Sequence, residues 1–161
     1  MPNGYVIYDG ASLHNGERII MIALTSKSSN SKTGAMMQTY IITPHNPMYA
    51  SKHGLDSENC GDCPHRGIPT DDPNRKQAKD RKCYVKLFQG VYQVWKQWQN
   101  GAYPILQGHD ALASLGEGKD VRIGTYGDGG LVPSYICDSL ISKARKHTAY
   151  CHQYDNPNSS F

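Results

Sequence analysis

The chain has 161 residues, of which 38% are hydrophobic and 19% charged, and its formal net charge at pH 7 is +3. A chain of this length buries roughly two thirds of its unfolded surface, so we expect one domain that folds without disulfide bonds. No apolar run reaches the roughly 18 to 20 residues of a membrane span, and the N-terminus lacks the pattern of a secretory signal. We therefore expect a soluble cytoplasmic protein. Its five cysteines, an odd number with uneven spacing, then point to metal binding or reactivity.

The first third of the chain is predicted to be rich in β-structure. Residues 4–8 alternate weakly in hydropathy, residues 17–25 contain the apolar run Ile-Ile-Met-Ile, and residues 38–43 have a Tyr-Ile-Ile centre. These patterns are typical of strands, and an Asn-Gly pair at 15–16 favours a hairpin between the first two. Residues 26–34 are too polar for a core, so we expect an exposed loop there.

The middle of the chain combines predicted helices with a long hydrophilic segment. A short helical turn is predicted at 49–55 and a second short helix at 109–115. Residues 83–100 carry aromatic and branched side chains at spacings of three and four, which is typical of an amphipathic helix. The segment 59–82 has almost no aliphatic side chains, so it cannot pack a core by itself and something else must order it.

The C-terminal third is predicted to form a parallel βαβ unit. A short buried strand at 121–124 leads into a glycine-rich turn at 126–130, a helix at 133–146 that begins with proline, and another strand at 148–152. Residues 155–161 are predicted to be a disordered tail.

A cysteine cluster is the strongest chemical signal. Cys60-Gly-Asp-Cys63 is followed, after nineteen intervening residues, by Cys83. A Cys-x-x-Cys turn directs two thiolates to one point, and a third cysteine at the start of a helix adds a third corner. A metal centre at these residues would also order the hydrophilic segment between them. A redox dithiol and unrelated free thiols are the alternatives.

The sequence leaves the identity of the metal open. A structural zinc ion takes four protein ligands, for which His65 or His152 is the fourth. A [4Fe-4S] cluster held by three cysteines would leave one iron open to a small ligand. Cys137 lies on an apolar helix face and is predicted to pack in the core, whereas Cys151 is left unassigned.

A second candidate site lies where two predicted parallel strands end. Tyr126 and Asp128 follow one strand and His152 and Gln153 follow its neighbour, and α/β folds place ligand sites at such ends. Asp128 and His152 are the predicted catalytic acid/base pair. The alternatives are a tight turn at Asp128 and a structural histidine at 152.

Basic and small polar residues suggest contacts with phosphate. Residues 66–86 hold seven Lys or Arg side chains against three Asp, a surplus that suits either phosphate binding or a solvated loop. The loop around Lys32 and Thr33 has a composition suited to phosphate or sugar, although its glycine spacing is not that of a P-loop. The predicted substrate-binding residues are Lys32, Thr33, Arg66, Arg122, Tyr126 and Gln153.

Six motifs together carry a family resemblance. They are SNSKTG at 29–34, MQTYII at 37–42, CGDCPHR at 60–66, CYV at 83–85, RIGTYGD at 122–128 and YCHQ at 150–153. In this order they resemble an uncharacterised family of small proteins encoded by tailed bacteriophages and prophages. Members usually have threonine at the position of Cys151. The resemblance therefore implies Cys60, Cys63 and Cys83 as the ligand set, a phage origin, and action in the host cytoplasm.

A more distant similarity concerns architecture. The order of cysteine cluster, helix and strand ends is similar to that of phage proteins that form partial barrels of the radical SAM type. Their three cysteines are spaced Cys-x3-Cys-x2-Cys, whereas the intervals here are two and nineteen, so the similarity implies no S-adenosylmethionine chemistry. We expect an α/β fold with a β-rich N-terminal part and a partial (β/α) barrel-like unit organised around the cysteine metal site. Residues 1–154 form this single domain.

Two classes of function remain open. In the first, a phage-encoded iron–sulfur or zinc protein acts on or binds a phosphate-bearing nucleotide or nucleic acid during infection, and the sequence leaves open whether it is an enzyme. In the second, the zinc-stabilised chain is a non-catalytic binding module, for example for nucleic acid or as an inhibitor of a host defence factor. An iron–sulfur centre would colour the protein, whereas zinc would not. We expect no membrane partner.

Overall fold

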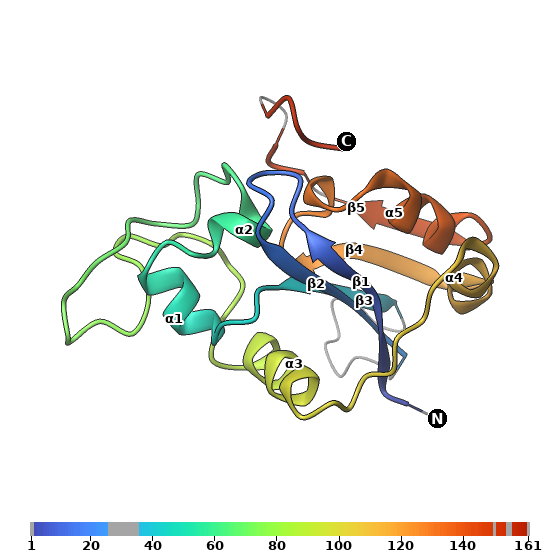
Figure 1. Ribbon diagram of the computed structural model, residues 1–161, viewed down its shortest axis with the longest axis horizontal. Helices are drawn as coiled ribbons and strands as arrows, with labels where there is room; N and C mark the ends of the chain where they lie inside the picture. Colours follow the sequence, from blue (N-terminus) through green and yellow to red (C-terminus); the bar gives the residue numbers. More distant parts are fainter. Residues whose placement is uncertain (1, 26–35, 150, 154–155, 161) are drawn as a thin grey trace.

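The fold is an open five-stranded sheet with helices on both faces (Figure 1). The computed structural model describes residues 2–25, 36–149, 151–153 and 156–160. The strands, which lie in sequence order, are β1 (Gly4–Ala11), β2 (Arg18–Leu24), β3 (Met37–Ile42), β4 (Asp120–Tyr126) and β5 (Lys146–Ala149). The first three pair antiparallel, and β3, β4 and β5 pair parallel. The predicted α/β class and β-rich N-terminal part are confirmed.

Helices connect and cover these strands. They are α1 (Pro47–Lys52), α2 (Ser57–Cys60), α3 (Gly90–Gln99), α4 (His109–Gly116) and α5 (Ser134–Ile141), with a 3-10 turn, η1, at Gly129–Leu131. The helix predicted at 109–115 is confirmed as α4. The helix predicted at 133–146 ends earlier, at Ile141, and a turn precedes β5. The last predicted strand begins at Lys146, two residues before its expected start.

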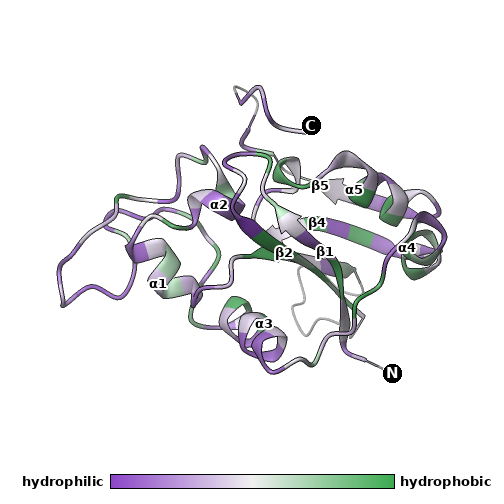
Figure 2. Ribbon diagram, viewed as in Figure 1, coloured by the Kyte–Doolittle hydropathy of each residue, from purple (hydrophilic) through white to green (hydrophobic). Residues whose placement is uncertain are grey.

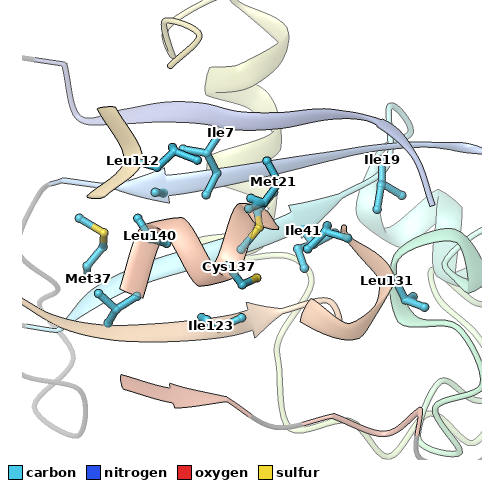
Figure 3. Close-up of a cluster of buried hydrophobic side chains, with 14 residues drawn as sticks. Ile7, Ile19, Met21, Met37, Ile41, Leu112, Ile123, Leu131, Cys137 and Leu140 are labelled. Atoms are coloured by element: carbon cyan, nitrogen blue, oxygen red, sulfur yellow. The ribbon is translucent and has the colours of Figure 1, made fainter. Parts of the chain in front are cut away.

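The alternating side chains of β2 build two hydrophobic cores. Ile19 and Met21 pack with α4 and α5 on one face, whereas Ile20 and Ile22 pack with α3 on the other. Figure 3 shows the first core, in which Cys137 of α5 lies among aliphatic side chains. The continuous apolar run thus belongs to a strand buried on both faces, and the ribbon of β2 is coloured as hydrophobic in Figure 2.

The predicted helix at 83–100 is wrong in its first seven residues, because α3 begins only at Gly90. Residues 87–89 form a turn that buries Leu87 completely and leaves Phe88 57% exposed. Periodicity alone missed this turn, although glycine inside a helix lowers its stability by about 1 kcal/mol relative to alanine and so favours a helix start at that position.

The hydrophilic segment between the second and third clustered cysteines is held by hydrogen bonds. Ile68 and Lys79 form an antiparallel bridge with N–H to oxygen distances of 2.7 and 2.8 Å. The Ala78 N–H donates to the Ser51 hydroxyl of α1 (3.1 Å), and the Thr70 N–H donates to the Lys52 carbonyl (2.9 Å). In Figure 2 most of this loop is coloured as hydrophilic. Hydrogen bonds to α1 therefore help to order this segment, a role that the sequence analysis gave to a metal centre.

The C-terminal segment lies against the glycine-rich turn after β4. Within the segment predicted as a disordered tail, the Ser160 N–H donates to the carbonyl of Gly130 (2.8 Å), and the Asn156 N–H donates to that of Gln153 (2.9 Å). These contacts bring residues 156–160 next to the end of β4.

Candidate functional site

A pocket of about 590 Å³ opens at the carboxyl ends of the parallel strands. It joins the cysteine turn after α2, the loop that precedes α3, the end of β4 and the segment after β5. Its lining consists of Cys60, Cys63, His65, Lys82, Cys83, Tyr84, Val85, Arg122, Gly124, Thr125, Tyr126, Gly127, Asp128 and His152. The cysteine cluster and the predicted site at the ends of the parallel strands, which the sequence analysis describes as two sites, therefore share one cavity.

Strand β4 forms one wall of the pocket. Arg122, Gly124 and Tyr126 line it, while Val121 and Ile123, which alternate with them along the strand, pack in the core beside α5. The strand bulges at Gly124, whose φ is +77° and whose N–H donates to the Thr39 hydroxyl (2.8 Å). Bulges of this kind redirect side chains beside functional sites.

Gly127 allows the end of β4 to approach β3 and α2 closely. Its φ is +81°, and a Cβ at this position would lie 2.6 Å from the Ile41 backbone oxygen. The next residue, Asp128, donates its N–H to the Asn59 carbonyl (2.8 Å), and the Asn59 side-chain amide donates to the carbonyl of Ile41 (2.8 Å). These contacts fix α2, and with it Cys60, against the sheet.

Hydrogen bonds bring Cys83 back to the Cys-x-x-Cys turn. The Cys63 N–H donates to the Cys60 carbonyl (3.2 Å), and the Cys83 N–H donates to the His65 carbonyl (3.1 Å). Arg81 also holds the segment around Cys83, because its guanidinium donates to the backbone carbonyl of Cys83 (3.2 Å). None of the three thiols forms a disulfide bond. Two segments far apart in sequence therefore place three free cysteines in the lining of one pocket.

The electrostatics of the cluster oppose three thiolates without a cation. Burial raises the pKa of the Cys60 thiol well above its ordinary value, and the nearby Asp56, Cys63 and Cys83 raise it further. Burial also raises the pKa of Cys63, although the backbone N–H of His65 opposes this by hydrogen bonding to its sulfur. A bound metal cation would reverse this balance, because it stabilises the deprotonated thiolates directly.

The cluster does not have complete ligand geometry. Within the part of the chain that the structure describes, no group of three or more His, Cys, Asp or Glu side chains is arranged to hold a metal ion. The rings of His65 and His152, the two candidates for a fourth ligand, meet edge to face with their centroids 5.5 Å apart. The metal centre predicted from the sequence therefore stays a prediction, and metal binding would require the cysteine loops to move closer together.

The predicted acid/base pair meets through backbone rather than through its two side chains. One Asp128 carboxylate oxygen accepts a hydrogen bond from the N–H of His152 (2.8 Å) and another from the Gln153 amide (3.3 Å). The other oxygen accepts from the N–H of Gly130 (2.9 Å). Asp128 is 4% exposed and anchors the segment after β5. Its catalytic role, like that of the His152 ring, stays a prediction.

Two predicted substrate-binding residues lie outside the pocket lining. Gln153 is 1% exposed, and its amide donates to the Cys60 carbonyl (2.7 Å) and accepts from the Asp62 N–H (3.0 Å). Arg66 faces the buried carboxylate of Asp56 at 3.8 Å. Burial raises the pKa of Asp56 to about 6, against the opposing charge of Arg66. The side chains of Gln153 and Arg66 thus contact other parts of the protein itself. The other two predicted substrate-binding residues, Lys32 and Thr33, lie outside the described residues.

The two remaining cysteines have separate environments. Cys137 of α5 is buried in the core, which confirms its predicted packing role, and burial raises its pKa to about 12. The Cys151 sulfur accepts a hydrogen bond from the Gln153 N–H (3.3 Å) and contacts the Ser159 hydroxyl at 3.8 Å. Neither sulfur lines the pocket.

Sequence reasoning missed Tyr84 and Lys82 as part of the site. The Tyr84 hydroxyl accepts a hydrogen bond from the Arg122 guanidinium (2.6 Å), and the Tyr84 side chain is a large exposed aromatic at the pocket. Their position directly before and after Cys83 was the available signal, but the predicted helix at 83–100 obscured it.

Comparisons with protein-family models, with curated proteins and with solved structures find no match for this chain. The similarity to phage proteins therefore remains a prediction. Among the residues described here, none of the helices is long and apolar enough to span a membrane.

Proposed function

We propose that this chain is a metalloprotein in which Cys60, Cys63 and Cys83 hold a zinc ion or an iron–sulfur cluster beside a ligand pocket. One observation carries the proposal: three free thiols from two distant segments line a single cavity at the carboxyl ends of parallel strands. Burial raises the pKa of the Cys60 thiol, and the nearby Cys63 and Cys83 raise it further. A shared cation would stabilise the deprotonated form of thiols that are gathered in this way.

The histidines of the pocket complete the proposed ligand set. His65 follows the Cys-x-x-Cys turn by two residues, and His152 lies with its ring against that of His65. Either imidazole supplies the fourth ligand of a zinc site, whereas a cluster held by the three cysteines keeps one iron accessible from the cavity. The metal would draw the two cysteine-bearing loops together.

The charge of the pocket lining supports a phosphate-bearing ligand. Lys82 and Arg122 both line the cavity and give it positive charge, which suits a nucleotide or a nucleic acid. We propose that the chain is phage-encoded and binds or transforms such a ligand in the host cytoplasm. In this account β3, α5, β4 and β5 correspond to the partial barrel-like unit.

Anaerobic purification followed by metal analysis and a visible spectrum tests the metal centre. We expect about one zinc ion, or about four iron atoms with absorption near ~400 nm, per chain. Cys83→Ala should lose this metal, whereas Cys137→Ala, which removes a core sulfur outside the pocket, should retain it. A folded wild-type chain that binds neither metal would overturn the proposal.

A non-catalytic zinc-stabilised binding module is the second candidate. It is favoured by Asp128, whose two carboxylate oxygens accept hydrogen bonds from Gly130, His152 and Gln153 and so hold the fold together. A colourless protein with tightly held zinc supports this module, and a brown iron protein supports a reactive centre.

A further inference from the structure

We propose that the mouth of the pocket recognises a nucleoside phosphate, whose base stacks on Tyr84 and whose phosphate binds Arg122 and Lys82. The inference deepens the proposed function by naming the ligand and its contacts. It rests on the phosphate-bearing ligand of that proposal and does not require the metal to be present. The nucleoside phosphate is either a free nucleotide or one unit of a single strand.

Tyr84 has the properties of a stacking platform. Its side chain is 72% exposed, the largest exposure among the exposed large hydrophobic residues that the structure describes. Its hydroxyl is nevertheless anchored by the Arg122 guanidinium at 2.6 Å. An aromatic ring that is held by its polar end and left uncovered by protein offers its face to a base, and such stacking tolerates any base.

Arg122, like Arg75 and Arg81, has no acidic partner among the described residues, and of these three arginines it is the one in the pocket lining. Arg18, Arg66 and Arg145 each face an aspartate within 4.0 Å. Among the described residues, no carboxylate lies that close to Arg122 or to Lys82. Two cations without a carboxylate partner in one cavity lining suit an anionic group, and the planar arginine suits a phosphate in particular.

The sheet continues the polar surface at Arg122 beyond the pocket. Arg122 pairs with Thr148 of β5, and Asp120 pairs with Lys146, so these side chains alternate onto the same face of the sheet. Every residue of β5 is exposed. Thr148 therefore extends the surface at Arg122 along the sheet edge, where a further phosphate of a strand would lie, whereas Lys146 lies beside the Asp120 carboxylate, which also pairs with Arg145.

Cavity size and the remaining charges set the orientation of the ligand. About 590 Å³ lies within the range of small-molecule sites, roughly 300 to 1,000 Å³, and leaves room for a nucleotide. Asp128 is the acidic residue of the lining, and it belongs to the end of β4 beyond Tyr126. The phosphate therefore lies towards Arg122 and away from Asp128.

Calorimetric titration of the full chain tests the inference. The ligands are deoxyadenosine monophosphate, deoxyadenosine, inorganic phosphate and the oligonucleotide (dA)8, each at about 50 and about 200 mM salt. We expect the monophosphate unit to bind more tightly than the nucleoside or phosphate alone. If (dA)8 binds more tightly than eight independent nucleotides would, the ligand is a single strand. If its affinity per nucleotide equals that of the monophosphate, the ligand is a free nucleotide. Both outcomes support the inference.

Matched variants separate the two contacts. Tyr84→Leu should weaken binding about 5- to 100-fold, and Tyr84→Phe should retain the stacking part. Arg122→Gln should weaken binding about tenfold and reduce its salt dependence. Tyr135→Leu is the control, because Tyr135 is 63% exposed on α5 and lies outside the pocket lining. Because Tyr84 is exposed, its variants should keep the fold, and a circular dichroism spectrum of each variant checks this.

The same samples are assayed for metal, so the two proposals fail separately. Tyr84-dependent binding by a metal-free wild type sustains the nucleoside phosphate site and overturns the metal centre. Metal-loaded protein that binds the monophosphate no better than inorganic phosphate, or that is unaffected by Tyr84→Leu, overturns the nucleoside phosphate site alone.

Discussion

At the scale of single residues, Gln153 connects the parts of the site. Its side-chain amide donates to the carbonyl of Cys60 and to the carboxylate of Asp128, and its side-chain oxygen accepts from the N–H of Asp62. A Cβ on Gly61 would lie 2.3 Å from that oxygen, so the cysteine turn and Gln153 fit closely. The sequence predicts Gln153 as a ligand contact, whereas the structure uses it to position the cysteine turn.

Gln153→Ala should destabilise the fold by about 2 to 4 kcal/mol, because it leaves buried hydrogen-bonding groups of the cysteine turn without partners. Amide hydrogen exchange at Asp62 should become faster in the variant. The control is Gln107→Ala at an exposed position before α4. Equal unfolding free energies for the two variants in urea would show that Gln153 does not hold the turn.

At the scale of elements, α1 supports the hydrophilic segment at residues 59–82. The Ser51 hydroxyl, which is buried, accepts the N–H of Ala78, and the bridge between Ile68 and Lys79 lies beside this contact in the sequence. Composition correctly indicates that residues 59–82 have no core of their own. The partners of this loop come from α1, and hydrogen bonds between such distant segments have no local sequence pattern.

Ser51→Ala should therefore loosen the loop even when the three cysteines are intact. We expect a loss of about 1 to 2 kcal/mol in unfolding free energy, because the buried Ala78 N–H loses its acceptor. Limited trypsin digestion should cut faster at the exposed Arg75 and Lys76. Ser114→Ala, at an exposed position of α4, is the control. Unchanged cleavage rates at Arg75 in Ser51→Ala would contradict the supporting role of α1.

At the scale of the whole molecule, the sequence predicts the arrangement better than the contacts. Hydrophobic patterns identify the first four strands, whereas β5 is fully exposed and the strand predicted at 148–152 overlaps it only at residues 148–149. The βαβ unit correctly predicts that Asp128 and His152 follow neighbouring parallel strands. Neither pattern shows that the rim and the cysteine cluster share a cavity, because this depends on the Asn59 contacts that dock α2. Tyr84 was missed for a similar reason, since its role depends on the distant Arg122.

X-ray absorption at the edge of the co-purifying metal shows whether the three clustered thiolates bind one metal. For zinc we predict three sulfur neighbours at about 2.3 Å and one nitrogen at about 2.0 to 2.1 Å, and for iron a shell of sulfur. Cys83→Ala should lose a sulfur neighbour or the metal itself. A first shell made of nitrogen and oxygen alone, in a folded wild-type chain, would contradict the account.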